Sequence, residues 1–348
     1  MDIVKGRTGH EVERSRQNPD ASSIRIAKPH DTADYRDDPI LHRRRPGGNL
    51  PTSAGVRIAM SRQQVSASDG RHGPASTLVD VALPGLGTLR LCVSRNGNGE
   101  PLLMIMGLGG GLGMWRPLVE ELDAVGTIAV DPPGVGESTT PFRPLSMVEL
   151  ADVYASLIRS LCLDSAHLIG FSFGGAVAQQ LAVSHPSVVR SLVLVSTGPG
   201  VGGVPGSPSA LAELCTPWRY YSPRRFRQVA PLVYGGRMAR DPEAVRGNMR
   251  ERMKAGPSYV GYVWQLTALA GWSSLPWLPY IKAPTLVLTG DEDPVFPVAN
   301  AEMLASRIPQ ADLEVVRGGG HLLVLDSAAE VAPKIVAFMQ RVSRASSR

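Results

Sequence analysis

The sequence predicts an α/β fold, a mostly parallel, doubly wound sheet that carries an inserted helical lid. Short apolar runs alternate with segments of helical spacing, and one long stretch interrupts this alternation. Between about Pro199 and Lys282, prolines, aromatic residues and short helical patterns replace the buried strands. An insertion at this place lies over the carboxyl ends of the strands, where α/β proteins bind ligands.

Four parts are expected along the 348 residues. Residues 1–75 form an N-terminal tail that we expect to be disordered, because they are rich in Arg, Asp, Ser and Pro and show no sustained apolar periodicity. Residues 76–198 and 283–348 form the two parts of the α/β core, and residues 199–282 form the lid. With 43% hydrophobic residues, the chain can bury a sizeable core.

The positive charge belongs mainly to the tail. Residues 1–75 carry thirteen Lys and Arg against nine Asp and Glu, whereas the whole chain has a net charge of +5. The remainder is therefore almost neutral, and a nucleic-acid partner is not expected for the folded part. The run Arg43 to Arg45 is read as a solvated part of the tail.

The cysteines and the apolar segments indicate the cellular compartment in which the protein is expected. Cys92, Cys162 and Cys215 are unevenly spaced and form no C-x-x-C pair, so neither a disulfide framework nor a zinc site is expected. The start of the chain lacks the apolar segment of a secretory signal, and no apolar stretch of about 20 residues predicts a membrane span. A reducing cytoplasm fits these features best.

Each element of the core follows from a local pattern. A hairpin joined by Pro84-Gly85 opens the folded part, and Ser146 with Glu149 predicts a capping box at the start of a helix. The expected strands are 78–83, 87–94, 101–106, 126–130, 166–169, 188–196, 284–289 and 313–317. The expected helices are about 115–123, 146–163, 176–183, 298–307 and 327–341.

A serine between two glycines marks the centre of this pattern. Gly170, Ser172 and Gly174 form a G-x-S-x-G sequence between an apolar strand and a helix. This is the pattern of a nucleophile elbow, which exposes the serine hydroxyl at the carboxyl end of the strand. Because the chain has 37 glycines, the motif alone could also be a plain strand-helix turn.

The activating base is expected to be His321. A serine hydroxyl needs a base, usually an imidazole that a carboxylate orients. His321 follows three glycines in a loop after the last strand, on the same side of the sheet as the serine. His167 begins the elbow strand and His185 ends the next helix, so both are expected to be structural.

The acid is expected after the strand 284–289. This strand ends in Asp291, Glu292 and Asp293, and we choose Asp293 because it lies beyond the strand tip before Pro294. Asp291 is expected to brace the turn. The alternative position, 196–198, holds Ser, Thr and Gly and supplies no carboxylate. The chain order serine, aspartate, histidine is that of α/β-hydrolases.

The negatively charged oxygen that forms during attack by the serine, the oxyanion, also needs two hydrogen-bond donors. The amides of Phe173 and Leu108 are the expected ones, each contributing about 3 kcal/mol to lowering the barrier. The glycine-rich run 107–113 lacks the remaining parts of a dinucleotide fingerprint, so no cofactor is expected. The turn 131–138 is expected to be structural and near the site.

With these motifs in place, residues 77–341 resemble the α/β-hydrolases, and they look closest to the intracellular depolymerases of medium-chain-length poly(3-hydroxyalkanoates). The similar segments are the turn 131–138, the helix 174–180, the lid segments 230–236, 240–243, 261–266 and 271–274, and the strand and loop 284–294. On the family pattern the acid falls on Asp293 and the base on His321. The resemblance implies hydrolysis of ester bonds in a water-insoluble storage polyester through an acyl-enzyme on Ser172, in the cytoplasm and in association with the storage granule.

Two other functions stay open. The same three residues would serve a small-molecule carboxylesterase or lactonase, and only the lid resemblance separates these from a depolymerase. A catalytically inactive binding protein would usually lack one of the three residues. The lid aromatics Tyr220, Tyr221, Trp264, Trp272 and Trp277 suit either the core of the lid or an apolar substrate surface.

Overall fold

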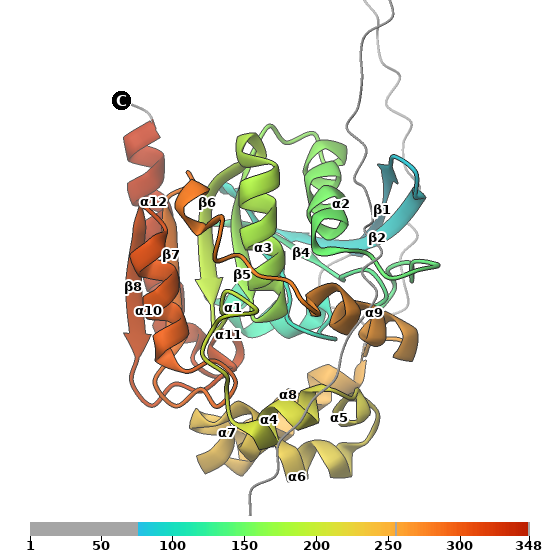
Figure 1. Cartoon of the computed structure of the whole chain (residues 1–348), viewed down its shortest axis with the longest axis vertical. Helices are drawn as coiled ribbons and strands as arrows, with labels where there is room; N and C mark the ends of the chain where they lie inside the picture. The colour runs from blue at the N-terminus through green and yellow to red at the C-terminus, as the bar shows by residue number, and fades with distance from the viewer. Residues whose placement is uncertain (1–75, 255, 347–348) are drawn as a thin grey trace, which may run out of the picture. The chain divides into compact units, whose positions relative to one another are not determined.

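The computed structural model describes residues 76–254 and 256–346, and the expected tail 1–75 lies outside these residues. The described residues contain one eight-stranded sheet in the order β1-β2-β4-β3-β5-β6-β7-β8 (Figure 1). Its strands are β1 (Ser76–Leu83), β2 (Gly87–Asn96), β3 (Pro101–Ile105), β4 (Gly126–Val130), β5 (Ala166–Phe171), β6 (Val189–Val195), β7 (Thr285–Gly290) and β8 (Ala311–Val316). No helix among the described residues is long and apolar enough to cross a membrane.

The pairing of the strands confirms the expected fold class. β1 and β2 form the antiparallel hairpin, and β2 runs antiparallel to β4. All other neighbours, from β4 through β3, β5, β6 and β7 to β8, are parallel. Because parallel strands are covered on both faces, β4, β5 and β7 consist entirely of buried residues. The sheet therefore places the carboxyl ends of β3, β5, β6, β7 and β8 along one edge.

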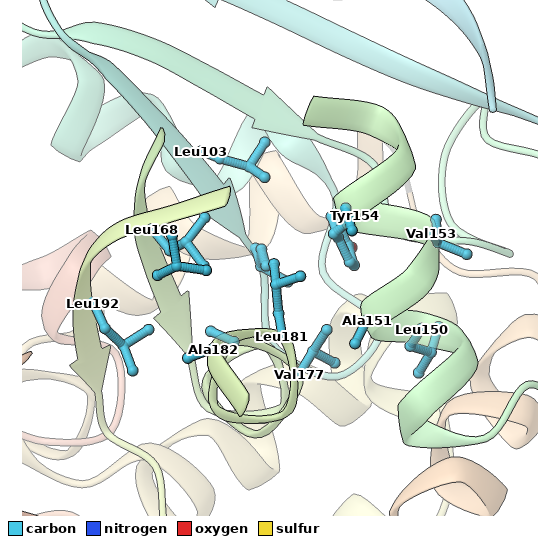
Figure 2. Close-up of a cluster of buried hydrophobic side chains, with 14 of the residues drawn as sticks. Leu103, Leu150, Ala151, Val153, Tyr154, Leu168, Val177, Leu181, Ala182 and Leu192 are labelled. Atoms are coloured by element: carbon cyan, nitrogen blue, oxygen red, sulfur yellow. The ribbon is translucent and has the colours of Figure 1, made fainter. Parts of the chain in front are cut away.

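Helices cover both faces of the sheet. One face carries α2 (Met147–Ser160), α3 (Phe173–Ser184) and α10 (Val298–Arg307). The other carries α1 (Arg116–Glu120), α11 (Leu323–Asp326) and α12 (Ala328–Ser346). Figure 2 shows Leu150 and Tyr154 of α2 and Leu181 of α3 in one buried cluster with the strand residues Leu103 and Leu168. Each large apolar side chain buried in this way stabilises the fold by about 1.5–3 kcal/mol.

The capping box predicted for α2 is present. The Ser146 side chain accepts a hydrogen bond from the Glu149 amide, and the Glu149 carboxylate accepts one from the Ser146 amide. Arg143 adds an ion pair to Glu149 at 2.6 Å. The hydrogen bond from Arg143 is the largest of the causes that lower the pKa of Glu149 to about 2. Local sequence thus determines where this helix begins.

The segment 199–282 contains helices and no named strand among its described residues. Its helices are α4 (Pro208–Leu214), α5 (Trp218–Tyr221), α6 (Pro223–Tyr234), α7 (Gly236–Arg240), α8 (Pro242–Lys254), α9 (Tyr259–Leu269) and η3 (Leu278–Tyr280). Figure 1 shows α4 to α8 gathered beyond the carboxyl-terminal edge of the sheet. We call this segment the lid.

Several helices differ from the expected bounds. The helix α2 ends at Ser160 rather than Leu163, and α12 runs to Ser346 rather than Arg341. The expected helix 115–123 is a 3₁₀ turn, η1 (Leu112–Trp115), followed by the short α1 (Arg116–Glu120). Pro117 lies in the first turn of α1, where its missing amide donor is tolerated. The helix after the elbow begins at Phe173, three residues earlier than the expected Ala176, and it includes Gly174 and Gly175.

Candidate active site

Ser172 lies in a strained turn between β5 and α3. Its backbone has φ 53° and ψ −117°, a conformation that residues with side chains rarely adopt. A Cβ atom on Gly174 would lie 2.0 Å from the carbonyl oxygen of Ile105, and one on Gly170 would lie 2.5 Å from the carbonyl oxygen of Gly174. The two glycines of the motif are therefore required by close backbone packing.

Neighbouring strands hold the turn in place. The Ser172 amide donates to the Val195 carbonyl at 2.9 Å, and the Thr197 hydroxyl donates to the Ser172 carbonyl at 2.8 Å. The segment after β6 that offered no carboxylate thus supports the backbone of the serine. Such fixed hydrogen bonds offset strain of about 1–3 kcal/mol at a residue of this conformation.

The three residues expected to act together lie within hydrogen-bonding distance of one another. Nε2 of His321 is 3.1 Å from the Oγ of Ser172, and Nδ1 of His321 is 2.9 Å from an Oδ of Asp293. They come from the ends of β5 and β7 and from the loop after β8. All three are buried. This arrangement can pass a proton from the serine hydroxyl to an imidazole that a carboxylate orients.

The carboxylates after β7 have three separate roles. One oxygen of Asp293 accepts the Val295 and Phe296 amides at 2.8 and 3.0 Å, which fixes the carboxylate while the other oxygen faces His321. Asp291 instead accepts the Gly318 amide at 2.7 Å and so braces the turn. Glu292 pairs with Arg240 on the surface.

The lid fixes the position of His321. The His321 amide donates to the Tyr234 carbonyl at 2.7 Å, and the Tyr234 ring stacks on the imidazole with centroids 6.2 Å apart. The junction of α6 and α7 packs backbone against backbone on the same loops. A Cβ on Gly235 would lie 2.1 Å from the Glu292 carbonyl oxygen, and one on Gly236 would lie 2.2 Å from the Gly320 nitrogen.

The other two histidines of the core make their side-chain contacts with residues outside this cluster. Nδ1 of the fully buried His167 lies 2.7 Å from the Ser191 hydroxyl, and burial lowers the pKa of His167. Nε2 of His185 lies 2.6 Å from an oxygen of Asp152. Both contacts link neighbouring elements of the core, as expected for structural histidines.

The loop after β3 is held from two sides. The Tyr220 hydroxyl donates to the Leu108 carbonyl at 2.6 Å, and the Gly109 amide donates to Oε1 of Gln265 at 2.8 Å. From the core, Oδ1 of Asp131 accepts the Leu112 amide at 2.7 Å. Among the described residues the Leu108 amide donates no hydrogen bond, so it is free to serve a ligand.

The site is closed. A cavity of about 20 Å³ touches Ser172, His321 and the loop that carries Leu108. That volume is about the space of one water molecule, far below the roughly 300–1,000 Å³ of ordinary ligand pockets. Ser172 is 9% exposed. An ester of several carbon atoms is larger than this space.

The lid aromatics divide between buried and exposed positions. Tyr220 is buried, and the indole N–H groups of Trp264 and Trp272 donate to the Pro141 carbonyl and the Gln180 side chain at 2.9 Å. Tyr221 and Trp277 are exposed. The hydrogen bonds place Trp264 and Trp272 at the boundary between the lid and the core.

Several residues at the site were not found from the sequence. Tyr234 and Gln265 bind the lid to the catalytic loops, and Arg219 and Arg252 line the cavity. An arginine in a helical pattern normally indicates a solvated face, so composition and periodicity gave no signal for the two buried guanidinium groups.

Comparison with known proteins agrees with the geometry. The family model described as alpha/beta hydrolase fold matches residues 100–328. A poly(3-hydroxyalkanoate) depolymerase of Ectopseudomonas oleovorans is 41% identical over 242 residues, which cover 69% of this chain and 84% of that protein.

Two solved structures share the fold at 25% identity or more. A thermophilic esterase from Thermogutta terrifontis has a TM-score of 0.64 at 25% identity and covers 77% of this chain and 98% of its own. Est816, described as an N-acyl homoserine lactone degrading enzyme, has a TM-score of 0.61 at 27% identity and covers 74% of this chain and 99% of its own. From the sheet order, the serine elbow and these matches, the chain belongs to the α/β-hydrolase fold family.

Proposed function

We propose that the protein is a serine hydrolase that cleaves the ester bonds of a poly(3-hydroxyalkanoate) storage polyester. The observation that carries the hydrolase chemistry is the buried chain of hydrogen bonds from Ser172 through His321 to Asp293. The similarity to the depolymerase of Ectopseudomonas oleovorans supports the choice of substrate.

In the proposed reaction the Ser172 Oγ attacks the carbonyl carbon of the ester, and Nε2 of His321 takes the hydroxyl proton. Asp293 stabilises the imidazolium that forms. The amides of Phe173 and Leu108 bind the oxyanion of the tetrahedral intermediate. His321 returns the proton to the departing alcohol, and water then hydrolyses the acyl-enzyme by the same steps in reverse.

An aromatic surface on the lid supports a polymeric substrate. Trp218 is 56% exposed, and its ring centroid lies 6.3 Å from Tyr221 and 6.4 Å from Tyr259, which are also exposed. Exposed apolar clusters mark interaction sites on proteins. In this proposal the cluster contacts the granule surface, and the protein works in the cytoplasm where the polymer is stored.

A small-molecule esterase or lactonase is the second candidate. The observation that favours it is the small cavity at Ser172, together with the shared fold of the Thermogutta terrifontis esterase and Est816. The two candidates share the chemistry and differ in the substrate that the opened lid admits.

The decisive experiment measures release of 3-hydroxy acids from emulsified poly(3-hydroxyoctanoate) alongside hydrolysis of p-nitrophenyl butyrate. The depolymerase proposal expects both activities. Fast turnover of the small ester without release of hydroxy acids would favour the second candidate.

Ser172→Ala provides the matched control for both substrates. Loss of the nucleophile should reduce kcat by about 10⁶-fold, as removal of the serine does in other serine hydrolases. Hydrolysis that survives this substitution would refute the proposed nucleophile.

A further inference from the structure

Two buried arginines line the cavity at the serine. Arg219 comes from α5 and Arg252 from α8, and they are 3% and 2% exposed. Both border the same cavity of about 20 Å³ as Ser172 and His321. Arginine stays protonated in proteins, so two positive charges face a small space beside the nucleophile.

No carboxylate of the described residues neutralises either arginine. Arg219 is held by neutral oxygens: its Nε donates to the Tyr234 hydroxyl at 3.0 Å, and one Nη donates to the Tyr262 hydroxyl at 2.6 Å. Further bonds run to the carbonyls of Glu213 and Thr216. Burial acts to lower the pKa of Arg219, but the phenol oxygens around it outweigh burial and raise the pKa further above its ordinary value.

Arg252 has fewer polar partners. Its Nε donates to Oδ1 of Asn248 at 2.6 Å, and among the described residues its two Nη groups donate to no acceptor. The guanidinium carbon lies 4.8, 5.1 and 5.4 Å from the ring centroids of Tyr234, Tyr220 and Phe226. These aromatic rings orient the guanidinium and leave its terminal N–H groups available for a ligand.

The chemistry of this pair selects a compact anion. Burial of an unpaired charge is costly unless a counter-charge or hydrogen bonds compensate. The planar fork of a guanidinium matches the two oxygens of a carboxylate. The cavity is too small for an aliphatic side chain, and the guanidinium groups that border it favour an anionic group.

We propose that Arg252, supported by Arg219, forms a carboxylate subsite that directs hydrolysis to the ester bond next to a free carboxyl end. This inference rests on the proposed ester hydrolysis. In a chain of 3-hydroxy acids the terminal carboxylate is separated from the last ester oxygen by two carbon atoms, so Ser172 and Arg252 can engage the same terminal unit. Each cleavage consumes one water and releases one 3-hydroxy acid, which exposes a new carboxyl end.

The test compares two forms of one substrate, the linear dimer of 3-hydroxyoctanoic acid as the free acid and as its methyl ester. For the unaltered protein we expect kcat/KM to be at least about tenfold higher for the acid, because hydrogen bonds to charged groups contribute about 1.5–3 kcal/mol. In Arg252→Met, which keeps the volume and loses the charge, this ratio should fall to about one. Equal kcat/KM values for acid and methyl ester in the unaltered protein would overturn the subsite.

Arg227→Met is the matched control. Arg227 is an exposed arginine on α6 of the same lid, so the acid-to-ester ratio should stay as in the unaltered protein. A thermal melt checks that Arg252→Met folds, and the comparison of the two substrates in the unaltered protein holds without any variant.

A binding measurement separates this inference from the proposed function. Titration of 3-hydroxyoctanoate into Ser172→Ala by calorimetry should give binding that is weakened at least about tenfold when Arg252→Met is added. Binding with this dependence but without hydrolysis of either dimer would refute the proposed function and keep the subsite. Equal binding with and without Arg252 would overturn the subsite alone.

Discussion

At the scale of single residues, the site depends on a few groups whose neighbours assign them different tasks. Three carboxylates follow β7 within three positions, yet Asp293 meets His321, Asp291 accepts a loop amide and Glu292 faces an arginine on the surface. The proline after Asp293 was the sequence feature that separated it from the other two. The structure adds the amides of Val295 and Phe296, which aim its carboxylate.

Asp293→Asn should reduce kcat by about 10⁴-fold, because an amide cannot hold the imidazole in the required tautomer or stabilise its charge. The matched control is Asp291→Asn, which should change kcat less than about tenfold and act mainly on the stability of the turn. Steady-state kinetics on p-nitrophenyl butyrate measures both. A larger loss in Asp291→Asn than in Asp293→Asn would contradict the assignment.

Gly174→Ala should lower the free energy of unfolding by about 3 kcal/mol or more, because its new Cβ would meet the Ile105 carbonyl oxygen at 2.0 Å. In a chain of this size the melting temperature should fall by at least about 6 °C. Gly247→Ala in the exposed part of α8 is the control, since nothing lies within 4 Å of the added atom. That variant should be as stable as the unaltered protein or about 0.5–1 kcal/mol more stable.

At the scale of elements, the lid and the catalytic loops form one hydrogen-bonded unit. Gln265 of α9 accepts the Gly109 amide, and Tyr220 of α5 donates to the Leu108 carbonyl. These two bonds hold the loop whose Leu108 amide is the proposed oxyanion donor. In the proposed reaction the lid therefore contributes to the position of the oxyanion donor.

Gln265→Leu should reduce kcat by about tenfold with a smaller change in KM, because the Gly109 amide loses its acceptor and the loop is held less firmly. Thr267→Ala on the exposed side of the same helix is the control and should leave kcat unchanged. Kinetics on p-nitrophenyl butyrate distinguishes the two. An unchanged kcat in Gln265→Leu would show that the loop keeps its position without the lid.

The elements differ in how well the sequence predicts them. Buried strands and capped helices carry local signals, so β4 was found with both its ends and α2 with its capping box. The lid contacts lack such signals. Gln265 and Gly109 are far apart in the chain, and their contact depends on how α9 packs on the core. Arg252 looks like an ordinary surface residue of a polar helix until tertiary packing places three aromatic rings around it.

At the scale of the whole molecule, the described structure leaves little space beside the nucleophile. Ser172, Asp293 and His321 are all buried, and the cavity beside them holds about one water molecule. On the proposed function, we expect a polyester chain to reach Ser172 only when lid elements separate from the core. Turnover is then expected to include a conformational step before the chemistry.

Reaction of Ser172 with p-nitrophenyl alkylphosphonates should reveal this step. At high reagent concentration the labelling rate should reach a plateau that is the same for butyl and hexyl reagents, because opening of the lid precedes reaction with either one. Nitrophenolate release measures the rate, and Ser172→Ala should show none. Plateaus that follow the intrinsic reactivity of each reagent would contradict a limiting opening step.

The tight packing at Gly235 and Gly236 has a consequence for protein engineering. At this junction the lid touches the loops of Asp293 and His321 through main-chain atoms, so any residue larger than glycine would displace both loops. Chimaeras that exchange α4 with that of another hydrolase can keep this junction, together with the α5 and α9 contacts to the loop of Leu108. A chimaera that also replaces the junction of α6 and α7 would have to take the loops of the acid and the histidine from the same hydrolase.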